Sequence, residues 1–248
     1  MEQTVDLDSL RAAQNRPPLR VLLLSMAESR LFILTDDLVP VRTHGFPVVV
    51  EAPHEEDTPH RDLPIHESTH DEARFVFRAV DHALSEAEGS DLPLIVVGPE
   101  RDLSLFAEVS HHRRDIVATV HGNHLHRRPD ELLEVIEPAR RAHLAAVRAT
   151  AIAKLDHAID AQRAALDPLE VWRAAHEGRG HLLLVDRTAE LRGEVTGDHF
   201  EWVEAEAADA PDAIPAIVAA VVQQGGEVVF TEPGELPSGA RLGLVLRY

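Results

Sequence analysis

The chain has 248 residues, of which 44% are hydrophobic and 27% charged, which is enough apolar material for one large or two modest cores. It contains no cysteine, which excludes disulfides, thiolate nucleophiles and cysteine-bound zinc. The net charge of −19 argues against nucleic-acid binding over the whole surface, because phosphate binding depends on Lys and Arg. We therefore expect a chain of two domains that does not bind DNA.

The N-terminal segment does not resemble a targeting signal. Residues 1–18 carry acids where a secretory signal carries basic residues followed by an apolar stretch. The sequence also has no run of about 18 apolar residues, the length that crosses a bilayer. These observations predict a cytoplasmic protein that does not enter a membrane.

The first elements in chain order are strands. Two apolar runs in RVLLLSMAESRLFIL (20–34) predict a hairpin that turns at MAES, and PVVVEA (47–52) predicts a third strand. The segment HEEDTPHRDLPIHESTH (54–70) combines prolines with polar residues and predicts a loop.

A helix is expected after this loop. Thr69 and Glu72 have the spacing of a capping box, which predicts a helix over residues 70–88. Its buried face should contain Phe77, Val80 and Leu84.

The next elements alternate between strand and helix. LPLIVVGP (92–99) predicts a strand buried on both faces, RDLSLFAEVS the following helix, and DIVATVHGN (115–123) the next strand and turn. Asp130 can then cap a long helical region, which Pro138 should restart or kink. This alternation predicts an α/β domain.

A second α/β domain follows. Asp167 as N-cap and Pro168 at the first helical position predict a helix that ends near Gly178. The later elements are predicted as strands at HLLLVD (181–186), FEWVE (200–204), EVVFTE (227–232) and ARLGLVLRY (240–248) and a helix at PDAIPAIVAAVVQQ (211–224).

Several stretches of the chain, in this order, carry a family resemblance. They are RVLLLSMAESRLFIL, LPLIVVGPERDLSLFAEVS, VHGN with the helix RPDELLEVIEPA, WRAAHEGRGHLLLVD, and QQGGEVVFTEPGELPSGARLGLVLRY. The chain resembles the bacterial archaeo-eukaryotic release factor family, which contains bacterial relatives of class 1 peptide-chain release factors and of Pelota. The resemblance runs from about residue 18 to the end of the chain.

The resemblance implies a fold and a domain boundary. It implies a ribonuclease-H-like middle domain over residues 1–165 and an α/β domain similar to ribosomal kink-turn-binding proteins over residues 166–248. No counterpart of the family's N-terminal domain is expected, since only about eighteen residues precede the first predicted strand. In release factors the loop between the third strand and the first helix carries a Gly-Gly-Gln motif, which this sequence lacks, so peptide release by that route is not expected.

The loop at 54–70 raises the possibility of a metal site. Imidazoles are zinc ligands, and the two last histidines are four residues apart, which would place both on one helix face. The capping box, however, places His66 outside the predicted helix, which favours a solvated acidic loop. The functional-loop candidates are His54, His60, His66 and His70.

Two basic clusters lie in the middle of the chain, where residues 101–166 hold 10 basic and 9 acidic side chains. Arginine binds phosphate through a forked pair of donors, and a neighbouring histidine can add a hydrogen bond. We interpret the clusters either as an RNA-contacting patch or as a solvated face with internal ion pairs. The RNA-binding candidates are His111, His112, Arg113, Arg114, His121, His124, His126, Arg127 and Arg128. Among these, His121 lies at a strand end beside Gly122, where α/β sheets bind ligands.

No catalytic residue, metal-ligand set or cofactor is predicted. Two-metal nucleases need converging carboxylates, and the first strand offers Ser25 instead. No Gly-x-Ser-x-Gly elbow and no Gly-rich phosphate loop occur. Trp172 and Trp202 are interpreted as core residues, and His176 and His181 as capping or packing residues.

Three hypotheses follow. The first is a non-catalytic translation-associated factor that binds the ribosome, or a ribosome-associated protein, in stalling, rescue or hibernation. The second is a metal-dependent hydrolase or metal-binding protein that uses the loop at 54–70. The third is an acidic protein–protein interaction module.

Overall fold

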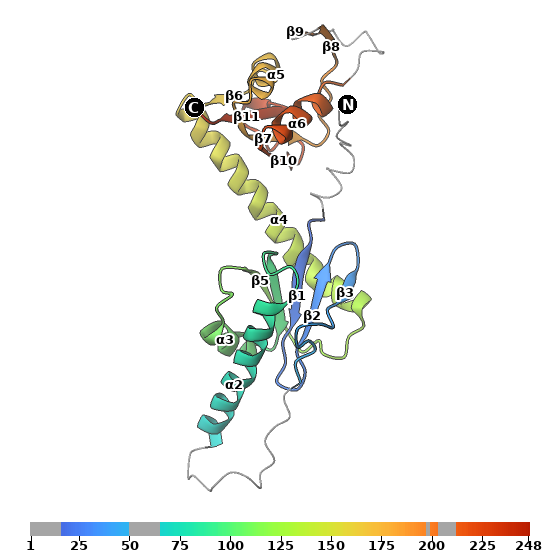
Figure 1. Ribbon diagram of the computed structural model, residues 1–248, viewed down its shortest axis with the longest axis vertical. Coiled ribbons are helices and arrows are strands. Elements are labelled where there is room, and N and C mark those ends of the chain that lie inside the picture. Colours follow the sequence, from blue (N-terminus) through green and yellow to red (C-terminus); the bar gives the residue numbers. More distant parts are fainter. Residues whose placement is uncertain (1–15, 50–64, 197–198, 203–211) are drawn as a thin grey trace. The chain divides into compact units, whose positions relative to one another are not determined.

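The computed structural model describes residues 16–49, 65–196, 199–202 and 212–248 (Figure 1). The described chain forms two compact units, Arg16–His143 and Leu144–Tyr248, each built around its own sheet. The predicted two-domain α/β fold is confirmed. The units divide within α4 (Pro129–Asp160), and the predicted domain boundary between residues 165 and 166 stays a prediction.

None of the described helices combines the length and the apolar character that a membrane-crossing helix needs.

The first unit contains a five-stranded sheet in the order β3-β2-β1-β4-β5. The antiparallel part consists of β1 (Leu19–Leu23), β2 (Arg30–Leu34) and β3 (Leu38–Pro40). On the other side of β1, the strands β4 (Leu94–Gly98) and β5 (Ile116–His121) run parallel to it. This order is the ribonuclease-H-like topology predicted for this domain.

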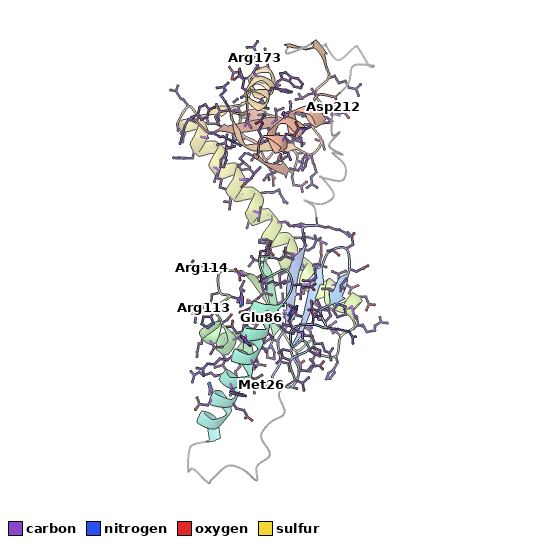
Figure 2. All side chains as sticks on the ribbon, in the orientation of Figure 1. Met26, Glu86, Arg113, Arg114, Arg173 and Asp212 are labelled. Carbon is purple, nitrogen blue, oxygen red and sulfur yellow. The ribbon has the colours of Figure 1, made fainter. Side chains whose placement is uncertain are left out.

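Helices cover both faces of this sheet. α2 (Ile65–Glu86) and α3 (Glu100–Val109) pack on one face, and the first half of α4 packs on the other. Because side chains alternate along a strand, Leu22 belongs to the core beneath α2 and α3, whereas Val21 belongs to the core beneath α4. Figure 2 shows Met26 in the loop that joins β1 to β2.

The start of α2 corrects the sequence prediction. The helix begins at Ile65 and not near residue 70, so the placement of His66 outside the helix is wrong. Proline is favoured at the start of helices, and Pro64, just before Ile65 in the sequence, is a start signal that competes with the capping-box spacing. The predicted buried positions are confirmed, since Phe77, Val80 and Leu84 are all 0% exposed.

The described half of the predicted third strand, residues 47–49, is not a strand. Within 47–52, the described residues form only an isolated bridge between Val48 and Ser29, and residues 50–52 lie outside the described residues. The edge strand is instead β3, which follows β2 after a tight turn where Thr35 N donates to Asp37 O (3.2 Å). Its last residue, Pro40, costs this edge strand no ladder bond, because the next bond to β2 runs from Val41 N to Leu31 O (2.9 Å).

α4 is one continuous helix that passes through Pro138, where a restart or a kink was the expectation. The helix begins at Pro129, so Asp130 lies in its first turn and is not its cap. An acid in the first turn still stabilises the helix, because the N-terminus carries a partial positive charge.

The second unit contains a four-stranded sheet in the order β10-β7-β11-β6. β7 (Gly180–Asp186) pairs parallel with β10 (Glu227–Thr231) and antiparallel with β11 (Leu242–Leu246). β11 pairs antiparallel with the two-residue strand β6 (Ala164–Ala165).

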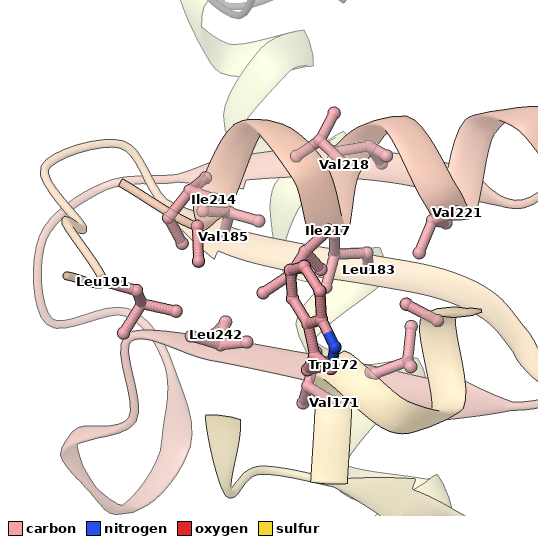
Figure 3. Packing of buried hydrophobic residues seen from close by; sticks show 14 of the residues in the cluster. Val171, Trp172, Leu183, Val185, Leu191, Ile214, Ile217, Val218, Val221 and Leu242 are labelled. Carbon is pink, nitrogen blue, oxygen red and sulfur yellow. The ribbon is translucent and has the colours of Figure 1, made fainter. Parts of the chain in front are cut away.

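The core of the second unit lies on one face of this sheet, beneath α5 (Pro168–His176) and α6 (Ile214–Gln223) (Figure 3). Trp172 is 4% exposed at its centre, as predicted. The predicted N-cap is confirmed, since Asp167 Oδ1 accepts from the backbone N–H groups of Leu169 (3.0 Å) and Glu170 (3.2 Å). The other face of the sheet packs against the second half of α4.

One further hairpin was not fully predicted. The expected strand at 200–204 corresponds to β9 (His199–Trp202), which pairs with an unpredicted strand, β8 (Gly193–Thr196). The side chain of Trp202 lies outside the described part of the structure.

Candidate functional site

The three parallel strands of the first unit end at the same edge of the sheet. We call the ends of these strands and the segments that follow, residues 24–29, 98–99 and 121–128, together with residues 41–47 after β3, the carboxyl edge. Backbone bonds hold these segments together, because Leu24 N donates to Val97 O (2.8 Å) and Gly122 N to Gly98 O (3.0 Å). Ligands of α/β proteins bind at this kind of edge.

The turn after β1 is held by two serines. Ser29 Oγ donates to Ser25 O (2.9 Å) and accepts from Ser25 N (3.1 Å), and Ser25 Oγ accepts from Ala27 N (3.2 Å). Ser25 therefore shapes the turn, and its hydroxyl is engaged there.

The loop between β5 and α4 requires a glycine. Gly122 has φ +132°, and a Cβ at this position would lie 2.5 Å from His124 Nε2. The same Nε2 donates to His121 O (3.3 Å), while Nδ1 of this ring is buried without a partner among the described residues. The backbone N–H of Arg127 donates to His124 O (3.1 Å), so the histidine ring and the main chain together fix the path of the loop.

A pocket of about 350 Å³ opens beside this loop. Its lining comes from the ends of β1, β2 and β3, the loop after β3, and the start of α4. The lining residues are Leu23, Glu28, Arg30, Leu31, Phe32, Pro40, Val41, Arg42, Pro47, Arg127, Pro129 and Leu132.

One arginine of the pocket is committed to the fold. Arg30 donates to both carboxylate oxygens of Glu28, from Nε (2.9 Å) and from Nη2 (2.7 Å), and its Nη1 donates to Leu125 O (3.4 Å). The hydrogen bonds from Arg30 hold the pKa of Glu28 below its ordinary value. The bidentate pair orients Arg30, and its bond to Leu125 O joins the β5–α4 loop to the start of β2.

Two other arginines of the pocket are not committed. Arg42 and Arg127 are exposed, and neither side chain has a hydrogen bond or an ion pair with the described residues. The pocket therefore presents two guanidinium groups that are available to an anion. A guanidinium binds phosphate or carboxylate through two parallel hydrogen bonds.

The sequence identified only part of this arrangement. Arg127 and His126 of the second basic cluster are exposed, whereas Arg128 pairs with Asp130 (2.9 Å) and Glu131 (3.5 Å) in the first turn of α4. Arg42 was missed, because it stands alone in VPVRTHG and only the fold brings it beside Arg127.

The first basic cluster lies at the opposite end of β5. We call the segments before β4 and β5, residues 87–93 and 110–115, the amino edge. A strand of six residues spans roughly 20 Å, so the structure does not bring the two clusters into one patch. Figure 2 shows Arg113 and Arg114 away from Met26, which lies at the carboxyl edge.

A buried carboxylate organises the amino edge. Asp81 accepts hydrogen bonds from Ser110 Oγ (2.7 Å) and His111 N (2.9 Å), and its second oxygen lies 2.6 Å from His111 Nδ1. Burial alone would raise the pKa of Asp81, but the hydrogen bonds from His111 and Ser110 outweigh it and lower this pKa. His111 is therefore engaged in the fold.

A second network at this edge contains a fully buried arginine. Arg20 is 0% exposed, and its guanidinium donates to the carbonyl oxygens of Ser90 (2.9 Å) and Leu92 (3.2 Å). It also lies 3.7 Å from Asp115, which in turn contacts His112 Nδ1 (2.9 Å). Burial lowers the pKa of Arg20, and the neighbouring carboxylates oppose this shift.

The two remaining arginines of the first cluster are exposed. Arg113 Nη2 donates to Glu108 O (2.6 Å), and Arg114 has no side-chain partner among the described residues. The first basic cluster is thus mostly used to hold the amino edge together.

The histidine-rich segment falls largely outside the described residues, which exclude His54 and His60. His66 and His70 both lie in α2, and the side chain of His70 is partly exposed. In the part of the chain that the structure describes, no three His, Cys, Asp or Glu residues are grouped so that they could hold a metal ion.

The chain was compared with known families and proteins. The sequence model of bacterial archaeo-eukaryotic release factor family 3 matches residues 18–179, which confirms the resemblance seen in the sequence. A comparison with curated proteins gave no match.

Solved structures show the same fold. Dom34 of S. cerevisiae, described as a translation termination-like factor involved in RNA quality control pathways and interacting with Hbs1, matches 93% of the chain with TM-score 0.54 and 11% identity. An archaeal Pelota in a model of ribosome-bound Pelota and ABCE1 matches 98% with TM-score 0.51 and 16% identity. The chain covers 63% and 65% of those two proteins, respectively.

Proposed function

The chain belongs to bacterial archaeo-eukaryotic release factor family 3, and we propose that it is a translation-associated factor that binds the ribosome through its carboxyl edge. It acts without catalysis, by occupying a site on stalled, rescued or hibernating ribosomes. Its partner is ribosomal RNA, or a protein on the ribosome.

The observation that carries this proposal is the pair of arginines without a side-chain partner among the described residues, at the pocket of about 350 Å³. In a chain with a net charge of −19, most of the surface repels RNA, so binding has to be local. Arg42 and Arg127 supply such a local site, because each guanidinium can bind a backbone phosphate.

The relatives support the class of function. Dom34 is described as a translation termination-like factor, and the archaeal Pelota is described as ribosome-bound. The sequence lacks the Gly-Gly-Gln motif of release factors, so peptide release is not part of the proposal. No observation in the described part of the chain favours the metal-dependent or the acidic-interaction hypothesis over this one.

Ribosome co-sedimentation at two salt concentrations tests the proposal. Three proteins are compared: the wild type, Arg42→Ala/Arg127→Ala at the carboxyl edge, and Arg113→Ala/Arg114→Ala near the amino edge. Both variants lose the same charge, so only the position of the charge differs. We expect the carboxyl-edge variant to bind much more weakly. The slope of log K against the logarithm of the salt concentration should decrease in magnitude by about 2, one for each lost phosphate contact.

The amino-edge variant should bind like the wild type. Equal losses in the two variants would mean that only net charge matters, and absence of binding by the wild type would refute the ribosome as partner.

A further inference from the structure

A groove in the second unit also gathers basic side chains. It has a volume of about 340 Å³ and is formed by the last turns of α4, the turn that follows, β7 and the end of β11. Its lining residues are Lys154, His157, Ala158, Arg163, His181, Val245, Leu246 and Arg247.

The groove contrasts with the rest of its unit. Residues 144–248 hold 9 basic and 17 acidic side chains, yet among the described residues no acidic side chain lines the groove. Such a distribution is not expected of an ordinary solvated face, where both signs of charge are mixed.

The lining of the groove includes five basic or histidine side chains. One of them, Arg247, is hydrogen-bonded to the backbone of the protein. Arg247 donates from Nε to Gly180 O (3.0 Å) and from Nη2 to Gln224 O (2.6 Å). The side chains of the other four, Lys154, His157, Arg163 and His181, are exposed and have no hydrogen bond or ion pair with the described residues.

Helix capping does not explain these side chains. Basic residues near a helix C-terminus often bind its last carbonyl groups. At the end of α4, however, backbone N–H groups already bind them: Ala161 N donates to His157 O (3.1 Å), Gln162 N to Ile159 O (2.9 Å) and Arg163 N to Ala158 O (2.7 Å). The basic groups are therefore left for an external anion.

We propose that this groove binds phosphate groups, either of an RNA backbone or of a small phosphate compound. Lysine supplies a point charge and arginine a forked pair of donors, a combination that suits phosphate oxygens. The groove is small for a ligand pocket, since such pockets range upward from roughly 300 Å³. The site lies in the second unit, and so it is additional to the proposed ribosome contact at the carboxyl edge.

Lys154 makes the groove directly measurable, because it is the only lysine of the chain. An amine-acetylating reagent followed by mass spectrometry reports the accessibility of its amino group, with the N-terminal amine as internal reference. The probes are inorganic pyrophosphate and a short oligouridylate. We expect a probe that occupies the groove to slow acetylation of Lys154 and to leave the N-terminal amine unaffected.

A charge reversal with a matched control completes the test. Arg163→Glu should weaken binding of the protecting probe by about tenfold, because a charge-assisted contact becomes a repulsion. Arg173→Glu changes the charge of the same unit equally, at an exposed position of α5 outside the groove, and should keep the protection.

The outcomes are distinct. Protection by oligouridylate alone identifies RNA as the source of phosphate, and protection by pyrophosphate identifies a small compound. Protection by neither probe, or an equal loss in both variants, overturns the proposal. Protection by pyrophosphate should persist in Arg42→Ala/Arg127→Ala, so that failure of the ribosome contact and failure of the groove are separable.

Discussion

The two edges of the first sheet both carry arginine and histidine, but they use them differently. At the amino edge, Arg20 is fully buried and bound to backbone carbonyl groups, and His111 is bound to Asp81. At the carboxyl edge, Arg42 and Arg127 are exposed and have no partner among the described residues. Apart from Arg114, the basic residues thus hold the amino edge together, whereas two arginines of the carboxyl edge are left available for an anion.

The difference follows from where the carboxylates lie. The amino edge places Asp81 and Asp115 beside its basic groups, so charge is neutralised internally. At the carboxyl edge, Glu28 is the only acid among the described residues that line the pocket, and Arg30 already occupies both of its oxygens. The number of basic residues does not distinguish the two edges, whereas the positions of the carboxylates do.

Replacing the buried arginine should produce the largest effect. Arg20→Met keeps much of the side-chain volume but leaves several carbonyl groups and Asp115 without their cation. We expect the free energy of unfolding to fall by about 3 kcal/mol, because each carbonyl group left without its donor costs about 1–3 kcal/mol. Urea denaturation followed by circular dichroism, with hydrogen exchange of the amides in Arg16–His143, measures this loss.

The matched control at the other edge is Arg42→Met, which should change stability by less than about 0.5 kcal/mol, as exposed substitutions do. If Arg20→Met and Arg42→Met were equally stable, the claim that basic residues stabilise the fold at the amino edge would be refuted.

The buried carboxylate of the amino edge should give the next largest effect. Asp81→Asn replaces an acceptor of several hydrogen bonds by a group that also donates, and it should cost about 2 kcal/mol at neutral pH. The folded-state pKa of Asp81 is lowered, so its contribution is present at neutral pH and is lost as the pH falls through that pKa. The difference in the free energy of unfolding between wild type and Asp81→Asn should therefore shrink in acid. A difference that stays constant with pH would contradict a stabilising role of the Asp81 carboxylate.

The sequence predicted those features that depend on local pattern. Phe77 and Leu84 follow the helical period of a buried face, and Asp167 followed by proline is a local start signal, so each was placed correctly. The start of α2 was misplaced because two local signals, Pro64 and Thr69, compete there.

The candidate site depended on distant residues and was predicted only in part. The two basic clusters are separated in sequence by the strand β5, and a strand places its two ends on opposite edges. The strand predicted at 115–123 already implied that the two clusters lie apart. Which edge of the sheet each cluster lies on, however, follows only from the order of the strands. Arg42 carries no local signal, since its neighbours in the pocket come from residues far away in the chain.

The shape of the carboxyl edge can be changed without a change of charge. Gly122→Ala introduces a Cβ that would meet His124 Nε2 at 2.5 Å, at a φ of +132°. We expect a cost of about 1.5 kcal/mol from backbone strain, together with weaker ribosome binding, because the loop that carries Arg127 must shift. Gly225→Ala is the control, since this glycine has φ +72° but no atom within 4 Å of the added Cβ. It should lose stability and keep ribosome binding, and a parallel loss of binding would assign the Gly122 effect to folding.

The smallest effect should come from an ion-pair cluster on α4. Hydrogen bonds from Arg140 and then Arg141 lower the pKa of Glu137 from its ordinary value of 4.5 to about 2. Because the folded-state pKa is depressed, this cluster stabilises the fold above about pH 4.5 and loses that contribution as the pH falls toward 2. Solvent screening reduces the contribution to roughly 1 kcal/mol, since Glu137 is partly exposed. Glu137→Gln should therefore be less stable than the wild type at pH 6 and equal to it near pH 2, and its ribosome binding should be unchanged. A loss of ribosome binding at pH 7 would extend the binding surface to α4 and break the contrast between a structural and an available set of arginines.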